Sequence, residues 1–266
     1  MKKVYSAVLA AAMICGFAQA NEVELDLEKP ADWKVVGNVK WVGEKKDVME
    51  VTGRALLTSA KRFDIDENKS YKLEADVKRI KGGATPIYVG FNLFDKDGKQ
   101  LPAHLVNIVY GSETPLLKPA KPGDKVLYVK DSPLWQKPTV YSLHINARKD
   151  LTDLPNYDLY IIAAKSVKNG ALELQLKTPV TRDIPAGTLV RAHMMGGYMY
   201  TAGYKTMKEG ESFEFKGVAK GRAKYGMPST AWAAGAVKAE VIILVNWNSE
   251  GAKAVTQVKD VELEIK

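Results

Sequence analysis

The stretch SYKLEADVKRIKGGATPIYVGFNLFDKDGKQ, residues 70–100, decides the fold class of this chain. Residues 71–78 alternate apolar and charged side chains, and this period of two places one face of a strand in a core and the other in water. Residues 87–94 form a second expected strand, again with apolar side chains on one face. Gly82-Gly83 joins the two strands, and Asp97-Gly98 turns the chain back after the second. The stretch therefore predicts antiparallel β-structure.

The second expected strand presents Tyr88, Gly90, Asn92 and Phe94 on its other face. Such a face is either covered by another part of the chain or is a binding surface. The solvent face of the first strand, by contrast, carries charged residues and no aromatic ring. We interpret the whole stretch as scaffold and expect binding residues on the later strands, between residues 141 and 204.

Alternating apolar residues and intervening turn residues continue to the end of the chain. Further strands are expected at residues 33–36, 47–52, 62–66, 104–110, 125–130, 139–147, 157–165, 171–178, 188–194, 213–216, 240–246 and 258–265. A sustained helical period is absent, and the best candidates for short helices are residues 204–208 and 230–238. This pattern predicts an all-β fold with little helix, an antiparallel β-sandwich of the jelly-roll type.

The first twenty residues are typical of a secretory signal peptide. Lys2 and Lys3 precede an apolar run from Val8 to Phe17, which ends in the small-residue site Ala18-Gln19-Ala20. The run is shorter than the roughly 20 apolar residues that a membrane-spanning helix needs. We therefore expect an exported protein without a membrane span, located in the periplasm, on the cell surface or outside the cell.

Residues 21–266 are expected to form a single enlarged β-sandwich. The alternative is two sandwiches, divided near the proline-rich and lysine-rich loop 112–124. Cys15 is the only cysteine and leaves with the signal peptide, which excludes a disulfide, a thiol nucleophile and a thiolate metal site from the mature chain. Positive charges exceed negative ones, but they are interspersed with acidic residues and do not form the basic clusters of nucleic-acid-binding proteins.

Three segments resemble secreted carbohydrate-binding modules of the family 4 and 9 type, which share the galactose-binding-like jelly roll. The segments are SYKLEADVK (70–78), YVGFNLFDKDGK (88–99) and VIILVNWNSEGAKAVTQVKDVELEI (241–265). Tyr71 and Leu73 match a tyrosine-x-leucine strand of that family. Asp260-Val261 matches half of an aspartate pair in its last strand, with Lys259 in place of the other aspartate. The middle of the chain, residues 112–187, is not covered.

The resemblance implies a non-catalytic protein that binds a polysaccharide or another glycan. Many such modules also hold a structural calcium ion with an acidic residue near the N-terminus and an aspartate of the last strand. By that analogy Asp260 is the expected calcium ligand, with Glu24 or Asp26 as its partner. Calcium takes six to eight oxygen ligands, and only these few can be named from the sequence.

Sugar binding requires flat aromatic rings and a few hydrogen-bonding side chains. Arg191 and His193 share one face of an expected strand, and two tyrosines follow just beyond Gly196-Gly197. His144 lies on the polar face of another strand. The expected ligand-binding residues are His144, Arg191, His193, Tyr198, Tyr200 and Trp135, the last in a proline-flanked loop. Trp33, Trp41 and Trp247 are expected in the core.

Two other classes of function stay open at this stage. Glu24-Leu25-Asp26-Leu27-Glu28 resembles the catalytic strand of laminarinase-like glycoside hydrolases, in which alternate carboxylates share a face. An arginine and a histidine beside tyrosines are also what a polysaccharide lyase requires, so Arg191, His193, Tyr198 and Tyr200 allow that chemistry. The third class is a structural protein of the cell envelope without a small ligand.

Overall fold

Both strands of the stretch 70–100 form, as β4 (Ser70–Lys81) and β5 (Thr85–Phe94). They do not pair with each other, however. β4 pairs with β13 (Ser212–Lys220) and β15 (Val255–Ile265), whereas β5 pairs with β12 (Met199–Met207) and β14 (Lys238–Val245). The turn at Gly82 therefore carries the chain from one layer of a sandwich to the other, where an antiparallel pair would have kept both strands in one layer.

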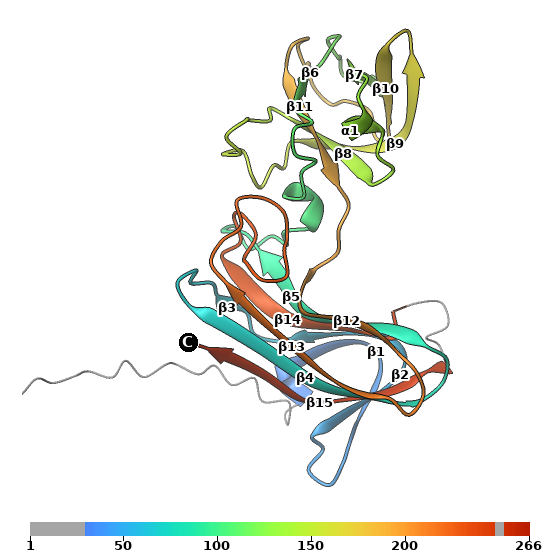
Figure 1. Cartoon of the computed structure of the whole chain (residues 1–266), viewed down its shortest axis with the longest axis vertical. Coiled ribbons are helices and arrows are strands. Elements are labelled where there is room, and N and C mark those ends of the chain that lie inside the picture. The colour runs from blue at the N-terminus through green and yellow to red at the C-terminus, as the bar shows by residue number, and fades with distance from the viewer. Residues whose placement is uncertain (1–29, 248–252) are drawn as a thin grey trace, which may run out of the picture.

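This computed structural model describes residues 30–247 and 253–266, and the expected signal peptide lies outside them. Figure 1 shows two β units stacked along the long axis of the molecule. In the first unit the strand order is β12-β5-β14-β2-β15-β4-β13, with β1 on β2 and β3 on β14. The remaining strands of this unit are β1 (Trp33–Val42), β2 (Val48–Ser59) and β3 (Phe63–Asp64).

The strand β2 belongs to both layers of the first unit. Its residues 55–58 pair with β14, and its residues 49–52 pair with β15. The change occurs at Gly53, whose φ of +74° suits glycine. The Asn246 side chain holds this crossing point, because its Nδ2 donates to the Gly53 carbonyl (2.7 Å) while its Oδ1 accepts from Thr256 (2.8 Å).

The core of the first unit lies between its two layers. The inward faces of β4 and β5 contribute the apolar residues that the alternation predicts. The largest fully buried side chain of this core is Trp232, which lies in the turns before β14. Its ring contacts Tyr71 and Phe91, with ring centroids 4.9 Å and 5.1 Å away. The expected all-β antiparallel sandwich with little helix is therefore confirmed.

The second unit is a small β-barrel with its own core. Its strands are β6 (Thr114–Pro115), β7 (Val126–Lys130), β8 (Val140–Ile145), β9 (Leu159–Lys168), β10 (Ala171–Leu176) and β11 (Leu189–Met194). They follow the order β6-β11-β8-β9-β10-β7, and an antiparallel bridge from Leu116 to Val129 closes the ring between its two ends. The core of this unit is a separate cluster of buried residues.

The second unit is inserted between β5 and β12 of the first. The expected loop 112–124 lies inside it and contains β6, so the chain passes between units at residues 95–113 and again at 195–198. Contacts across the junction include the Tyr157 hydroxyl, which donates to an Asp95 carboxylate oxygen, and the Gly226 N–H, which donates to the Val106 carbonyl (2.8 Å). The part of the chain that the structure describes thus contains two sheets and two cores, whereas the expected single enlarged sandwich would contain one core.

Three expected elements differ from the structure. Residues 104–110 were expected as a strand, but they form the 3-10 helix η2 (Ala103–Leu105) and turns, because their buried side chains serve two different cores. Residues 204–207 belong to β12, and residues 230–236 form turns before β14, so neither expected short helix forms. The other helices in the described residues are η1 (Pro30–Asp32) and α1 (Pro133–Gln136), and no described helix is long and apolar enough to cross a membrane.

Candidate functional site

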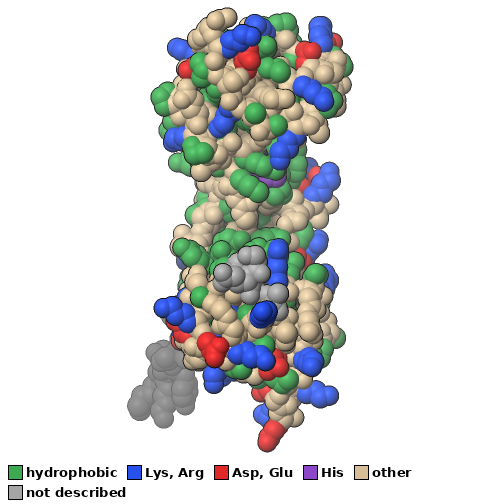
Figure 2. All heavy atoms as spheres, turned by 90° about the vertical axis from the view of Figure 1, so that its right-hand side faces the viewer, with side chains coloured by type: hydrophobic (Ala, Val, Ile, Leu, Met, Phe, Trp, Pro, Cys, Tyr) green, Lys and Arg blue, Asp and Glu red, His purple; other side chains and the backbone are tan. Residues whose placement is uncertain are grey.

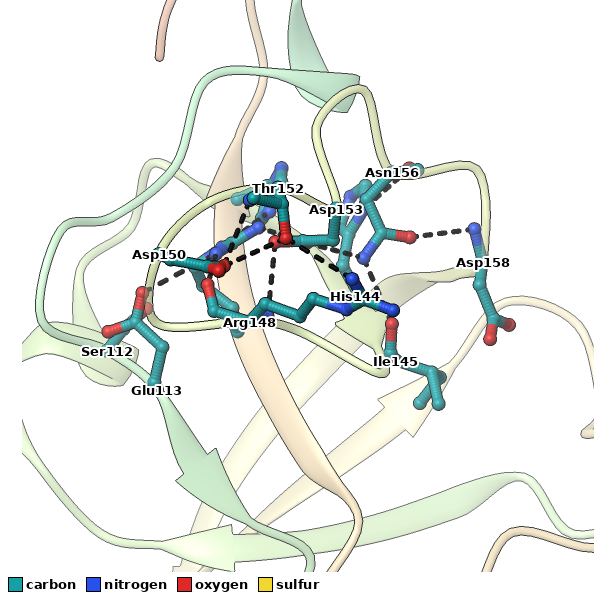
Figure 3. A network of polar contacts seen from close by, with 12 residues as sticks. Ser112, Glu113, His144, Ile145, Arg148, Asp150, Thr152, Asp153, Asn156 and Asp158 are labelled. Carbon is teal, nitrogen blue, oxygen red and sulfur yellow. Dashed lines mark hydrogen bonds and ion pairs between the residues drawn. The ribbon is translucent and has the colours of Figure 1, made fainter. Parts of the chain in front are cut away.

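Arg191 belongs to a buried polar network in the second unit through its contacts with Asp153 and Arg148. Figure 3 shows this network, with Asp153, Arg148 and His144 among the labelled residues. Arg191 is fully buried on β11, and its guanidinium forms ion pairs with Asp153 (2.5 Å) and Glu113 (3.6 Å). It also donates to the Arg148 carbonyl (3.1 Å). Because two carboxylates already balance its charge, Arg191 is not available to neutralise the carboxylate of a bound sugar acid.

The histidines of β8 and β11 are locked into the same network. The rings of His144 and His193 stack with centroids 3.5 Å apart and planes inclined by 11°. Each Nδ1–H donates to a backbone carbonyl, that of Asn156 for His144 (2.9 Å) and that of His104 for His193 (2.7 Å). The Nε2 of His193 accepts from Arg191 (3.2 Å). The Nε2 of His144 accepts from the Ser142 hydroxyl (2.9 Å).

Burial keeps both histidines neutral. Loss of solvation, with the neighbouring His193 ring as the next cause, lowers the pKa of His144 to about 2. Loss of solvation, together with the positive charge of Arg191, lowers the pKa of His193 to about 3. All four ring nitrogens have partners inside the protein, so neither ring can exchange a proton with a substrate. The network holds loop 148–158 against the strands beneath it.

Trp135 is also fully buried. Its side chain is 1% exposed in the core of the second unit, and its indole N–H donates to the Ser112 carbonyl (2.8 Å). We expected Trp135, with His144, Arg191 and His193, to contact a ligand at the surface. In this structure none of the four side chains reaches the surface, because tertiary partners satisfy their polar atoms.

The expected calcium ligands do not form a site in the described residues. Asp260 lies on an irregular turn of β15 with a φ of +48°, its side chain is 62% exposed, and it pairs with Lys259 (2.8 Å). Glu24, Asp26 and the remaining acidic row up to Glu28 lie outside the described residues. Within residues 30–247 and 253–266, no group of three or more His, Cys, Asp or Glu side chains is arranged to hold a metal ion.

Tyr198 and Tyr200, in contrast, belong to a chain of four tyrosine rings on the outer face of β5 and β12. We call this chain the tyrosine strip. The ring centroids of Tyr204 and Tyr88 lie 5.5 Å apart, those of Tyr88 and Tyr200 4.8 Å, and those of Tyr200 and Tyr198 6.4 Å. Tyr204 is 69% exposed, and the other three rings are half-buried. Burial raises the pKa of Tyr200 above its ordinary value.

A bulge in β12 brings Tyr200 onto this face. Met199 is paired with Phe91 and Gly203 with Val89, so three residues of β12 stand opposite Gly90 alone. The backbone of β12 passes so close that a Cβ at Gly90 would lie 2.0 Å from the Met199 carbonyl oxygen. Glycine at position 90 therefore allows the bulge of β12 to lie directly over β5.

The strip leads into a depression of about 230 Å³ at the junction between the two units. Tyr198 and Gly196-Gly197 line one side, from the segment that returns to β12. Asn92 and Gln100 bring amide groups to the other side, from the end of β5 and the turn after it. The depression thus offers hydrogen-bonding groups next to the half-buried ring of Tyr198.

The outer face of the other layer is different in character. Its strands β4, β13 and β15 carry a network of ion pairs, in which Glu74 contacts Lys72 (2.7 Å) and Lys216 (3.1 Å) and Lys259 lies near Asp76 (3.8 Å). Figure 2 shows hydrophobic side chains gathered between the two units on the face in view, while most charged side chains lie toward the two ends. The tyrosine strip is therefore the better candidate for a binding surface.

Sequence reasoning found two residues of this strip and passed over Tyr88. The signal was present, because Tyr88 alternates with the core residues Ile87 and Val89 and so had to lie on the opposite face. We interpreted the stretch 70–100 as scaffold because the solvent face of its first strand carries charged residues and no aromatic ring. Tyr204 lies beside Tyr88 because β5 pairs with β12, and this pairing spans more than a hundred residues of inserted chain that no local pattern can bridge.

Comparison with known proteins assigns no family to this chain. No protein-family model matches the sequence, and no curated protein matches it. The likeness to carbohydrate-binding modules therefore stays a prediction.

Proposed function

We propose that this chain is an exported, non-catalytic protein that binds a polysaccharide or another glycan along the tyrosine strip. The observation that carries the proposal is the row of four tyrosine rings on one layer of a β-sandwich, from the exposed Tyr204 through Tyr88 and Tyr200 to Tyr198, which are half-buried. Aromatic faces stack on the C–H faces of sugar rings, and tyrosine hydroxyls add hydrogen bonds at the edge.

The neighbouring depression supplies the polar groups that such a site needs. Asn92 is held in place because its Nδ2 donates to Glu240 Oε1 (2.8 Å), and Gln100 is exposed at the rim. Amide groups can both donate to and accept from sugar hydroxyls. An open strip that ends in a small polar depression suits an extended chain of sugars bound at one end.

Affinity electrophoresis and a glycan array with the mature chain test the proposal. We expect Tyr88→Ala and Tyr204→Ala each to weaken binding about 5- to 10-fold, because an aromatic contact contributes about 1 kcal/mol beyond its buried area. Phe213→Ala is the matched control, since Phe213 is an aromatic residue, 39% exposed, on the opposite layer. The proposal fails if no glycan binds, or if the tyrosine variants bind as well as the Phe213 variant.

A further inference from the structure

Arg54 differs from the other arginines that the structure describes. Its guanidinium carbon lies 3.5 Å from the centre of the Trp247 indole, and its side chain is exposed on β2. No hydrogen bond or ion pair from residues 30–247 or 253–266 engages its N–H groups. The remaining arginines there all have polar partners: Arg62, Arg79, Arg148, Arg182, Arg191 and Arg222.

The stacked pair borders a depression of about 320 Å³. Val36, Gly37 and Leu56 form its apolar wall. Gly37 permits the close approach of β1 to β2 here, because a Cβ at this position would lie 2.7 Å from the Cβ of Ala55. The depression therefore combines an apolar wall, an indole ring and five unused N–H donors in one place.

The depression and the tyrosine strip lie on the same outer face. Directly paired residues connect them in one row across five strands: Val36, Leu56, Leu244, Tyr88 and Tyr204. The ends of this row are exposed, with Val36 at 68% and Tyr204 at 69%, whereas Leu244 in its middle is covered and only 1% exposed. Neighbouring strands are about 4.8 Å apart, so two strand spacings place Leu56 about 10 Å from Tyr88. A bound chain of a few sugars can contact both places.

We infer that the glycan bound on this face carries anionic groups, and that Arg54, held over the Trp247 ring, binds them. This inference rests on the proposed function and specifies the class of glycan. A guanidinium presents a planar fork of N–H donors that matches two oxygens of a carboxylate or a sulfate ester. Contact with the indole restricts the side chain of Arg54 in advance, which lowers the entropy lost on binding.

Isothermal titration of the mature chain with oligogalacturonate, a sulfated galactan and a neutral β-glucan tests this assignment. We expect at least one of the two acidic probes to bind. The affinities of the two probes show whether the site prefers a carboxylate or a sulfate group. Arg54→Gln should weaken binding of that probe about 10-fold, which corresponds to about 1.4 kcal/mol. Arg54→Lys should recover only part of the loss, because lysine keeps the charge but lacks the fork. Binding of the acidic probe should also change the Trp247 fluorescence, and Trp247→Phe should remove that change.

Arg182→Gln is the matched control, because it removes the same charge from the second unit, where Arg182 is paired with Asp158. If Arg54→Gln weakens binding no more than Arg182→Gln does, Arg54 is not the anion-binding residue. If only the neutral glucan binds, and Tyr88→Ala weakens it, the inference is wrong while the proposed function stands. If none of the three probes nor any glycan of the array binds, both are wrong.

Discussion

The imidazole rings of His144 and His193 stack 3.5 Å apart in the second unit, and each ring is hydrogen-bonded through both of its nitrogens. Neither imidazole ring can take up a second proton without breaking one of these hydrogen bonds. The stack therefore makes the stability of this unit depend on pH.

Stability should fall as the pH falls below the ordinary histidine range. Burial lowers the pKa of His144 to about 2 and that of His193 to about 3, so the folded state stays neutral where the unfolded chain takes up protons. The free energy of unfolding should be highest above about pH 6.5 and should decrease between about pH 6.5 and 4.5, by on the order of 2 kcal/mol per histidine. Urea unfolding at several pH values measures this slope.

His144→Gln provides the comparison for the pH experiment. This variant has one fewer proton to take up on unfolding, so its stability should depend less steeply on pH even if it is less stable at neutral pH. A wild-type stability that stays constant down to about pH 4.5 would contradict the neutral stack.

Asp153→Asn should destabilise the second unit strongly. The substitution removes the charge 2.5 Å from the Arg191 guanidinium and leaves the buried cation with Glu113 at 3.6 Å. We expect a loss of about 3 kcal/mol, because a buried charge loses its closest partner. Asp150→Asn, three residues away and exposed, should change stability by less than about 0.5 kcal/mol. Thermal unfolding of the two variants side by side decides the matter, and equal effects would sink the idea.

Gly90→Ala should displace the bulge of β12 and weaken glycan binding together with stability. A Cβ at this position would overlap the Met199 carbonyl oxygen, and a Cβ at Gly217 would meet the Thr201 carbonyl oxygen from the other side of the same bulge. We expect each substitution to cost about 1 to 3 kcal/mol. Titration of both variants with a glycan that the wild type binds checks the link to Tyr200. If both variants bind the glycan with unchanged affinity, the bulge does not contribute to the binding site.

Tyr157→Phe should loosen the junction between the units without affecting either core. The lost hydroxyl donates to Asp95, whose other carboxylate oxygen accepts from the N–H groups of Asp97 and Lys99 (both 2.9 Å). That turn leads to Gln100 at the rim of the depression. The backbone amide hydrogens of the turn should exchange about 5-fold faster, because the lost hydrogen bond lowers the free energy of local opening by about 1 kcal/mol. Hydrogen exchange followed by mass spectrometry measures this, with the interior strands of both units as the internal reference.

Prediction of secondary structure from the sequence was most accurate for strands whose alternating apolar side chains all pack into one core. β4 and β5 were recognisable because their alternate side chains are apolar, and a period of two has one structural solution. Residues 104–110 were misassigned because their apolar side chains divide between two cores, which no local pattern reveals. His144 and Arg191 were expected at the surface because polar residues usually are, but loop 148–158 supplies their buried partners.

The sequence alone determined the all-β class and the inward faces of strands such as β4 and β5, because alternation is a local property of the chain. Only the tertiary structure decided that β4 and β5 lie in opposite layers, that a second unit is inserted between β5 and β12, and that Tyr88 contacts Tyr200 and Tyr204. These relations depend on strand pairing over long sequence separations. Strand pairing is set by packing across the whole molecule, and several pairings satisfy the same local pattern.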